Sequence, residues 1–277
     1  MPLLTVVLTS ALFAGLVAVG ATVAVERLGG RVGGVLATSP STIIVAAAGV
    51  FVAAPTEAAF QAAMSATPAG MLLNALFLWL WRLLPPHLPA WGLGARLALM
   101  TTLSLSTWLV LAFGVLTTLG PIRAAGDTAT LLKIGLGLTV AAIFLGLMTS
   151  RGAATTPSKP RPVPFGVLMA RGLFAAMAVS VAVLWSRFGG PLAAGMASVF
   201  PVIFLTTMVS LWLSQGEAVQ SGAVGPMMLG STSVSAFTLL AAFALPAFGV
   251  VGGSVVSWLG AVCLVSLPAA AWVRRGR

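Results

Sequence analysis

The sequence predicts an all-α membrane protein of about nine transmembrane helices, from its composition and from the length and uniformity of its apolar runs. Hydrophobic residues make up 59% of the 277 residues and charged residues only 6%, whereas soluble domains carry about 25% charged residues. Apolar runs of roughly twenty residues, long enough to cross a hydrocarbon core of about 30 Å, recur along the chain. Backbone amides in that core need internal partners, and uniform runs of this length favour helices over the alternating strands of a barrel.

The predicted spans lie at about residues 3–25, 31–54, 66–84, 93–116, 130–150, 164–185, 190–213, 226–247 and 250–272. The first run lacks a basic n-region, so we interpret it as a membrane helix and not as a secretory signal. Residues 55–65 are predicted to form a short amphipathic or re-entrant segment. Residues 151–164, rich in proline and basic residues, are predicted to form a linker.

Lysine and arginine residues near the span ends predict the orientation of the chain. With the N-terminus outside, only Arg123, Lys133 and Arg187 of the 14 basic residues lie on the outer face. Cytoplasmic loops carry the excess of basic residues, so we expect an odd number of spans, an external N-terminus and a cytoplasmic C-terminus in the inner (plasma) membrane. The basic residues form no patch or stripe, so the net charge of +10 predicts no nucleic-acid partner.

The two ends of the chain resemble each other at an offset of 160 residues, the separation of Arg27 and Arg187. The matches are Glu26–Gly30 with Ser186–Gly190, Thr56–Ala59 with Gly216–Val219, and, within one residue, Pro40 with Pro201. Four spans and a connector return the chain on the opposite side, so the repeats are expected to be inverted. The predicted domains are a first four-helix repeat at 1–118, a connector helix and cytoplasmic linker at 119–163, and a second four-helix repeat at 164–277.

The second half carries a pattern of its own. Its elements are Arg187–Gly190, then Ala197, Ser198 and Pro201, then Glu217, and finally a proline-bearing helix rich in small residues at Gly225–Pro246. With this pattern each half resembles a family of small four-helix bacterial membrane proteins of the GlpM-like type. The resemblance covers roughly residues 165–272 and, more faintly, 3–116. It implies a four-helix unit and brings no activity with it.

Two corresponding spans are interrupted by proline, each after hydroxyl residues. Thr38 and Ser39 precede Pro40, and Ser198 precedes Pro201. Proline removes a backbone donor and clashes with the preceding turn. Broken helices at matching positions of two repeats are typical of a transporter's substrate site. The alternative is a kinked helix with no ligand.

A glycine-rich stretch with two arginines precedes the first of these breaks in the sequence. Gly29–Gly34 contains two overlapping GxxxG spacings, which allow close packing of membrane helices. With Arg27 and Arg31 beside it, the same stretch is also a candidate anion site at a helix N-terminus. Helix packing is the simpler interpretation.

Glu57 and Glu217 are repeat-equivalent carboxylates in short polar stretches. Ionisable groups within a membrane protein are candidates for function because their burial is unfavourable, so this pair is a candidate for coupling to a proton or cation. The alternative is that both residues cap short interfacial helices. Asn74 belongs to a cluster of polar residues in the middle spans, which either line a path for a solute or bond neighbouring backbone.

No constellation for catalysis or metal binding is evident. His87 is the only histidine, Cys263 is the only cysteine, and the four acidic residues are dispersed. Hydrolases and transferases usually combine a nucleophile, a base and an orienting group. We therefore expect no enzyme activity, no catalytic residues, no metal and no cofactor. Tryptophans near the span ends are expected to form an interfacial belt: Trp79, Trp81, Trp91, Trp212 and Trp272.

Three functions remain open after these exclusions. The leading hypothesis is a transporter or facilitator of a small solute, working by alternating access between two inverted repeats. The alternatives are a passive ion channel of dual-topology-like architecture and a non-transporting envelope or lipid-handling subunit. The expected partners are the lipid bilayer and a small solute or ion, and a homodimer is left open.

Overall fold

The computed structural model describes residues 2–28, 40–151, 165–188, 190–215 and 217–275, and all regular structure in these ranges is helical. Seven stretches within them are helical, long and apolar enough to cross a membrane. Large apolar side chains cover the outside of the bundle, including Val110 and Phe113, both 70% exposed, and Val251, 79% exposed. Apolar surface on this scale fits lipid and not water. The prediction of an all-helical, multi-pass membrane protein is confirmed.

The first half of the chain begins with α1 (Leu3–Leu28) and ends with two long helices. Its other members are α3 (Thr42–Ala53), α4 (Glu57–Leu83), a 3-10 turn η1 (Pro85–His87), α5 (Leu93–Ala124) and α6 (Thr128–Ser150). The prediction of a separate segment at residues 55–65 is wrong, because α4 runs through it. Thr56 caps α4 by accepting a hydrogen bond from the Ala59 amide at 3.1 Å, and the alanines that follow are strong helix formers.

The second half contains α7 (Phe165–Phe188), α8 (Pro191–Ser198) and α9 (Val202–Gln215), followed by α10 (Glu217–Ala261), a π-helical turn η2 (Val262–Ser266) and α11 (Leu267–Arg275). At Gly249 the backbone of α10 has φ 71° and ψ 178°, outside the helical region. A Cβ on Gly253 would lie 2.5 Å from the backbone of Ala244 and Leu245. The two arms of α10 therefore fold back on each other at Gly249.

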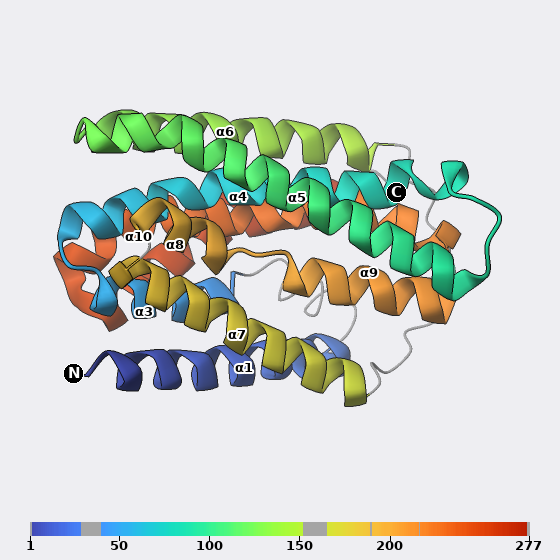
Figure 1. Ribbon diagram of the computed structural model, residues 1–277, viewed down its shortest axis with the longest axis horizontal. Helices are drawn as coiled ribbons and strands as arrows, with labels where there is room; N and C mark the ends of the chain where they lie inside the picture. The colour runs from blue at the N-terminus through green and yellow to red at the C-terminus, as the bar shows by residue number, and fades with distance from the viewer. Residues whose placement is uncertain (1, 29–39, 152–164, 189, 216, 276–277) are drawn as a thin grey trace.

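Helix α4 lies at the centre of the bundle, against α6, α8 and α10 (Figure 1). Helices α5 and α6 cover one side of this centre, and α1 and α7 cover the other. In its membrane-length stretch 78% of α4 is buried, compared with 22% of α5. Its buried side chains are mostly small, among them Ala62, Ala63, Ala66 and Ala69. Small side chains let neighbouring helix backbones approach closely in lipid.

Close helix crossings fall at glycines of α1, α7 and α8. A Cβ on Gly15 of α1 would lie 3.1 Å from the carbonyl oxygen of Gly172 in α7, and one on Gly195 of α8 would collide with the backbone of Ala63 in α4. Gly15 also faces Ala176, while Val19 faces Gly172, so α1 and α7 run antiparallel. The predicted packing motif at Gly29–Gly34 lies outside the described residues.

The five tryptophans predicted to form the interfacial belt divide into an exposed and a buried group. Trp79, Trp91 and Trp272 are exposed, as expected for an interfacial belt. Trp81 and Trp212 are fully buried, and their rings pack edge to face with centroids 5.8 Å apart. The prediction of a belt position is wrong for this pair, since they join α4 to α9 in the interior.

Candidate functional site

The helix break at Pro201 separates α8 from α9. Proline has no amide proton to donate to the turn before it. The Phe200 amide bonds the Ala197 carbonyl at 3.2 Å in a tightened turn, and α9 then starts with the bond from the Leu205 amide to the Pro201 carbonyl at 2.8 Å. The interruption predicted at Pro201 is present. It lies inside an otherwise apolar stretch that runs from Pro191 to Leu213.

Asn74 of α4 fastens this break. Its side-chain amide donates a hydrogen bond of 2.7 Å to the Val199 carbonyl, and its oxygen accepts one of 2.8 Å from the indole of Trp108 in α5. In a continuous helix the Val199 carbonyl would accept from the amide of Ile203, four residues on. Asn74 is only 1% exposed. The break is therefore a defined backbone turn whose freed carbonyl is satisfied by a side chain from another helix.

A hydroxyl group and two aromatic rings also stabilise the turn at the break. Ser198 donates to the Gly195 carbonyl at 2.6 Å within α8. The ring of Phe200 packs edge to face against Trp108, with centroids 5.2 Å apart. Local hydrogen bonding of this kind is the usual role of hydroxyls in membrane helices. Ser198 thus stabilises the last turn of α8, directly before the break.

The predicted site residues at the first break, and Glu217 of the second half, are only partly described. Pro40 is buried and lies two residues before the start of α3, which Ser41 precedes as N-cap. Thr38, Ser39 and Arg31 lie outside the described residues. Arg27 lies in the last turn of α1 and Glu217 is the first residue of α10, but their side chains are also outside the described part of the chain.

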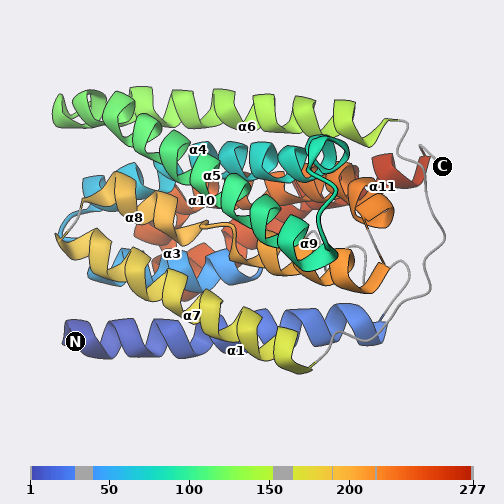
Figure 2. The same cartoon turned by 45° about the vertical axis from the view of Figure 1, so that its right-hand side comes forward.

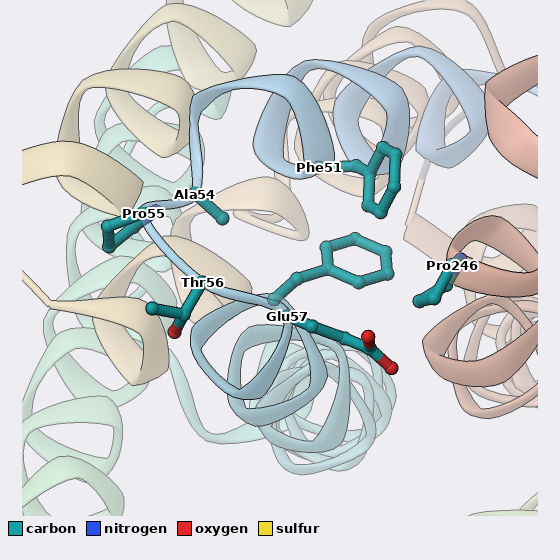
Figure 3. Close-up of a pocket in the computed structure, with 7 residues that line it drawn as sticks. Phe51, Ala54, Pro55, Thr56, Glu57 and Pro246 are labelled. Carbon is teal, nitrogen blue, oxygen red and sulfur yellow. The ribbon is translucent and has the colours of Figure 1, made fainter.

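Glu57 lies at one end of the bundle, away from the break. Its carboxylate is exposed, accepts a hydrogen bond of 3.1 Å from the Gln61 side chain, and points toward Pro246 across a pocket of about 300 Å³ (Figure 3). The rings of Phe51 and Phe60 pack edge to face on one wall of this pocket. At 1.5 Å per residue along α4, Glu57 is about 25 Å from Asn74. The structure does not bring these two predicted site residues together.

Arg171 is the residue that the sequence-based prediction missed. It is the seventh residue of α7 and is only 8% exposed. Its Nε donates to the Thr206 hydroxyl at 3.2 Å, and its Nη2 donates to the Thr207 hydroxyl at 2.8 Å. The orientation count places Arg171 on the cytoplasmic side, with all basic residues other than Arg123, Lys133 and Arg187. A lone arginine about 9 Å inside an apolar helix was the available clue.

The two threonines hold the guanidinium by one edge. Thr206 donates its own proton to the Val202 carbonyl at 2.9 Å, and Thr207 donates to the Ile203 carbonyl at 2.7 Å. Their lone pairs are therefore turned to Arg171. Nε and Nη2 form the edge with which arginine commonly grips the two oxygens of a carboxylate. This cluster lies in the second turn of α9, a few residues after Pro201.

A second pocket lies where α4 and α6 end. Arg82 donates to the Thr149 carbonyl at 2.6 Å, and Trp79 and Met148 line a space of about 370 Å³ beside them. Arg82 therefore donates to a backbone carbonyl that lacks a partner within the last turn of α6, an interaction that cations commonly make at the C-terminal end of a helix.

Within the described residues, no group of three or more His, Cys, Asp and Glu side chains could hold a metal ion. Comparisons of the chain with protein-family models, with curated proteins and with solved structures find no match. The resemblance of each half to GlpM-like proteins therefore stays a prediction.

Proposed function

We propose that the protein is an integral membrane transporter or facilitator of a small solute, working by alternating access between two inverted four-helix halves. The observation that carries this proposal is a helix broken inside its span, at Val199 to Pro201, with buried Arg171 of α7 bonded to the second turn of α9, which follows the break. Irregular backbone at membrane depth is tolerated where it is buried in protein or lines a cavity. Broken helices near the midplane form the solute sites of many secondary transporters.

The spacing of the helices supports the two halves. Helices α3 and α9 begin at Thr42 and Val202, and α4 and α10 begin at Glu57 and Glu217. Both separations are 160 residues, the offset at which the sequence repeats. If the stretch that folds at Gly249 makes two crossings and α3 is part of another, the seven membrane-length stretches of the described residues fit the proposed nine spans in a pattern of four, one and four.

The direction of the helices agrees with inversion. Helices α1 and α7, which occupy corresponding places in the halves, run antiparallel. The first residues of α1 and the last helix, α11, lie at opposite ends of the bundle, as an odd number of crossings requires (Figure 2). With the basic residues counted as before, we place the N-terminus outside and the C-terminus in the cytoplasm of the inner membrane.

The contacts around the break suggest how the halves move. Helix α8 packs on α4, through Gly195 and Ala63, and on α7, whereas α9 packs on α7 and α10. The turn at Val199 to Pro201 lies between these two attachments, so α9 can tilt while α8 stays on α4. Asn74 sets the resting geometry of that turn. A solute held beside α9 would then face each side of the membrane in turn.

Reconstitution into liposomes tests the proposal. Purified protein is to be assayed for uptake and for counterflow with panels of small anionic, cationic and neutral solutes. We expect saturable uptake and counterflow of at least one solute, at no more than about 10³ s⁻¹ as for enzyme-like turnover. A Pro201→Ala variant, in which the helix can close, should lose this activity. Flux orders of magnitude faster, without counterflow, would instead identify a channel, and no flux of any solute would refute transport.

A further inference from the structure

We propose that the pocket at the C-terminal ends of α4 and α6 binds an anionic phospholipid, with the lipid phosphate on Arg82 and part of an acyl chain against the apolar residues deeper in the pocket. The inference does not depend on transport, because it concerns the surface that the protein presents to the bilayer. Three observations support it: the order of residues along the two helices, the exposure of the pocket rim, and the setting of Arg82.

The two helices place polar and apolar residues at matching depths. Arg82 and Thr149 lie near the C-terminal ends of α4 and α6, and the two helices pack against each other, so they run parallel (Figure 1). Leu76 and Leu145 also line the pocket, about 9 Å and 6 Å farther from that end at 1.5 Å per residue. Met228 of α10, 1% exposed, adds a buried apolar part to the lining. A phospholipid has the same order of groups, a charged headgroup followed by apolar chains.

The pocket is open on the outside of the bundle. Trp79 of α4 and Met148 of α6 line it, and each is 45% exposed. Tryptophan rings favour the boundary between headgroups and hydrocarbon, where one edge is wet and the other apolar. The space of about 370 Å³ lies within the range of roughly 300–1,000 Å³ that is usual for ligand pockets. It therefore takes a headgroup and the start of one chain, while the rest of the lipid stays in the bilayer.

Arg82 is oriented by a neutral group. Its Nη1 donates to the Thr149 carbonyl at 2.6 Å, and within the described residues this is its one hydrogen bond and it forms no ion pair. A guanidinium has five N–H donors, and its planar fork matches the oxygens of a phosphate in pairs. The described lining of the pocket holds no carboxylate that would compete for this charge. Basic pockets of this kind between membrane helices bind the headgroups of anionic lipids.

The charges around Arg82 also favour a lipid. Arg151, two residues after Thr149, adds a second cation at this end, 5.7 Å from the centroid of the Trp272 ring. The carbonyls at the end of α6 carry partial negative charge, so without Arg82 the pocket would repel a phosphate. In the proposed orientation this end faces the cytoplasmic leaflet, whose surface is negatively charged. A free phosphate would gain nothing from the apolar part of the pocket, whereas a lipid chain would.

Lipid titrations with a matched arginine control test the site. The melting temperature of the full chain is to be measured in neutral detergent micelles against the mole fraction of phosphatidylglycerol, with phosphatidylcholine of the same chains and inorganic phosphate as separate arms at equal ionic strength. We expect phosphatidylglycerol to raise it saturably, as a ligand of the folded state does, and the other two to have little effect.

The substitution Arg82→Gln keeps an N–H donor near the Thr149 carbonyl but removes the charge. It should raise the apparent Kd for phosphatidylglycerol about ten-fold, the loss expected when a hydrogen bond to a charged group is removed. Arg96→Gln is the control, because Arg96 donates to the Pro85 carbonyl at 2.9 Å near the same end of the bundle and does not line the pocket. It should leave the apparent Kd unchanged.

A second variant keeps the test decisive if Arg82→Gln does not fold. Leu145→Trp fills the apolar part of the pocket from α6 while Arg82 keeps its charge, and it should also weaken binding several-fold. Equal stabilisation by phosphatidylglycerol and phosphatidylcholine, or by inorganic phosphate alone, would refute an anionic lipid as the occupant. Binding of phosphatidylglycerol by the folded variants as tight as by the wild type would refute this pocket as the site.

Discussion

Replacing Asn74 with leucine tests whether a single side chain fastens the helix break. The substitution keeps the approximate volume but removes the bonds of 2.7 Å to the Val199 carbonyl and 2.8 Å from the Trp108 indole. Leaving a buried polar group without a partner costs about 1–3 kcal/mol, although hydrogen bonds within membranes average only about 0.6 kcal/mol. With two groups orphaned, we expect Asn74→Leu to lower the free energy of unfolding by about 1–4 kcal/mol.

A double-mutant cycle with Trp108→Phe separates this effect from a general loss of packing. Reversible unfolding in mixed micelles of a mild detergent and sodium dodecyl sulfate, followed by circular dichroism, gives the free energies. Trp108→Phe alone should cost about 1 kcal/mol. In the Asn74→Leu background it should cost markedly less, because the orphaned indole donor is removed with it. Strictly additive losses, or a neutral Asn74→Leu, would show that Asn74 does not hold the break.

Two further predictions concern α8 and the start of α6. Gly195→Ala should lower the free energy of unfolding by about 1–3 kcal/mol, because the added Cβ would collide with the Ala63 backbone. Gly114→Ala in α5 is the control: nothing lies within 4 Å of its added Cβ, so it should be neutral or slightly stabilising in the same unfolding assay. The pKa of Asp127 is lowered by two hydrogen bonds from Thr130. The bond from the Thr130 side chain has the larger effect, and the bond from its backbone amide has the smaller one. Asp127 should therefore stabilise the fold above the ordinary pKa of aspartate and lose this contribution as pH falls through the lowered value. Unfolding measured from pH 7 to pH 3 should show a weaker pH dependence in Asp127→Asn, and an unchanged dependence would contradict the cap.

The sequence predicted those parts of the fold that the bilayer imposes. Composition and run length identify the helices because lipid satisfies no backbone group. The break at Pro201 was also predictable, since the missing amide of proline is a local property. Residues 55–65 were misassigned because their polar side chains hid a continuous helix that Thr56 caps.

Contacts between distant parts of the chain were not predictable in the same way. Asn74 bonds Val199, which is 125 residues away, and no local pattern identifies that partner. The burial of Arg171 depends on which face of α7 meets α9, and an apolar helix that is hydrophobic all round does not reveal its inner face. Trp81 and Trp212 resembled belt residues by their position near span ends, yet helix packing turned them inward.

The most direct test of transport by alternating access measures which side of the membrane reaches the break. Cys263 is the only cysteine of the chain and is exposed, so Cys263→Ser gives a background for a single reporter, Ser198→Cys. A membrane-impermeant thiol reagent is to be applied to right-side-out and inside-out vesicles, with Phe113→Cys on the apolar outer face of α5 as the control. We expect Ser198→Cys to react from both sides and Phe113→Cys from neither. Reaction of Ser198→Cys from one side only, or from neither, would contradict alternating access.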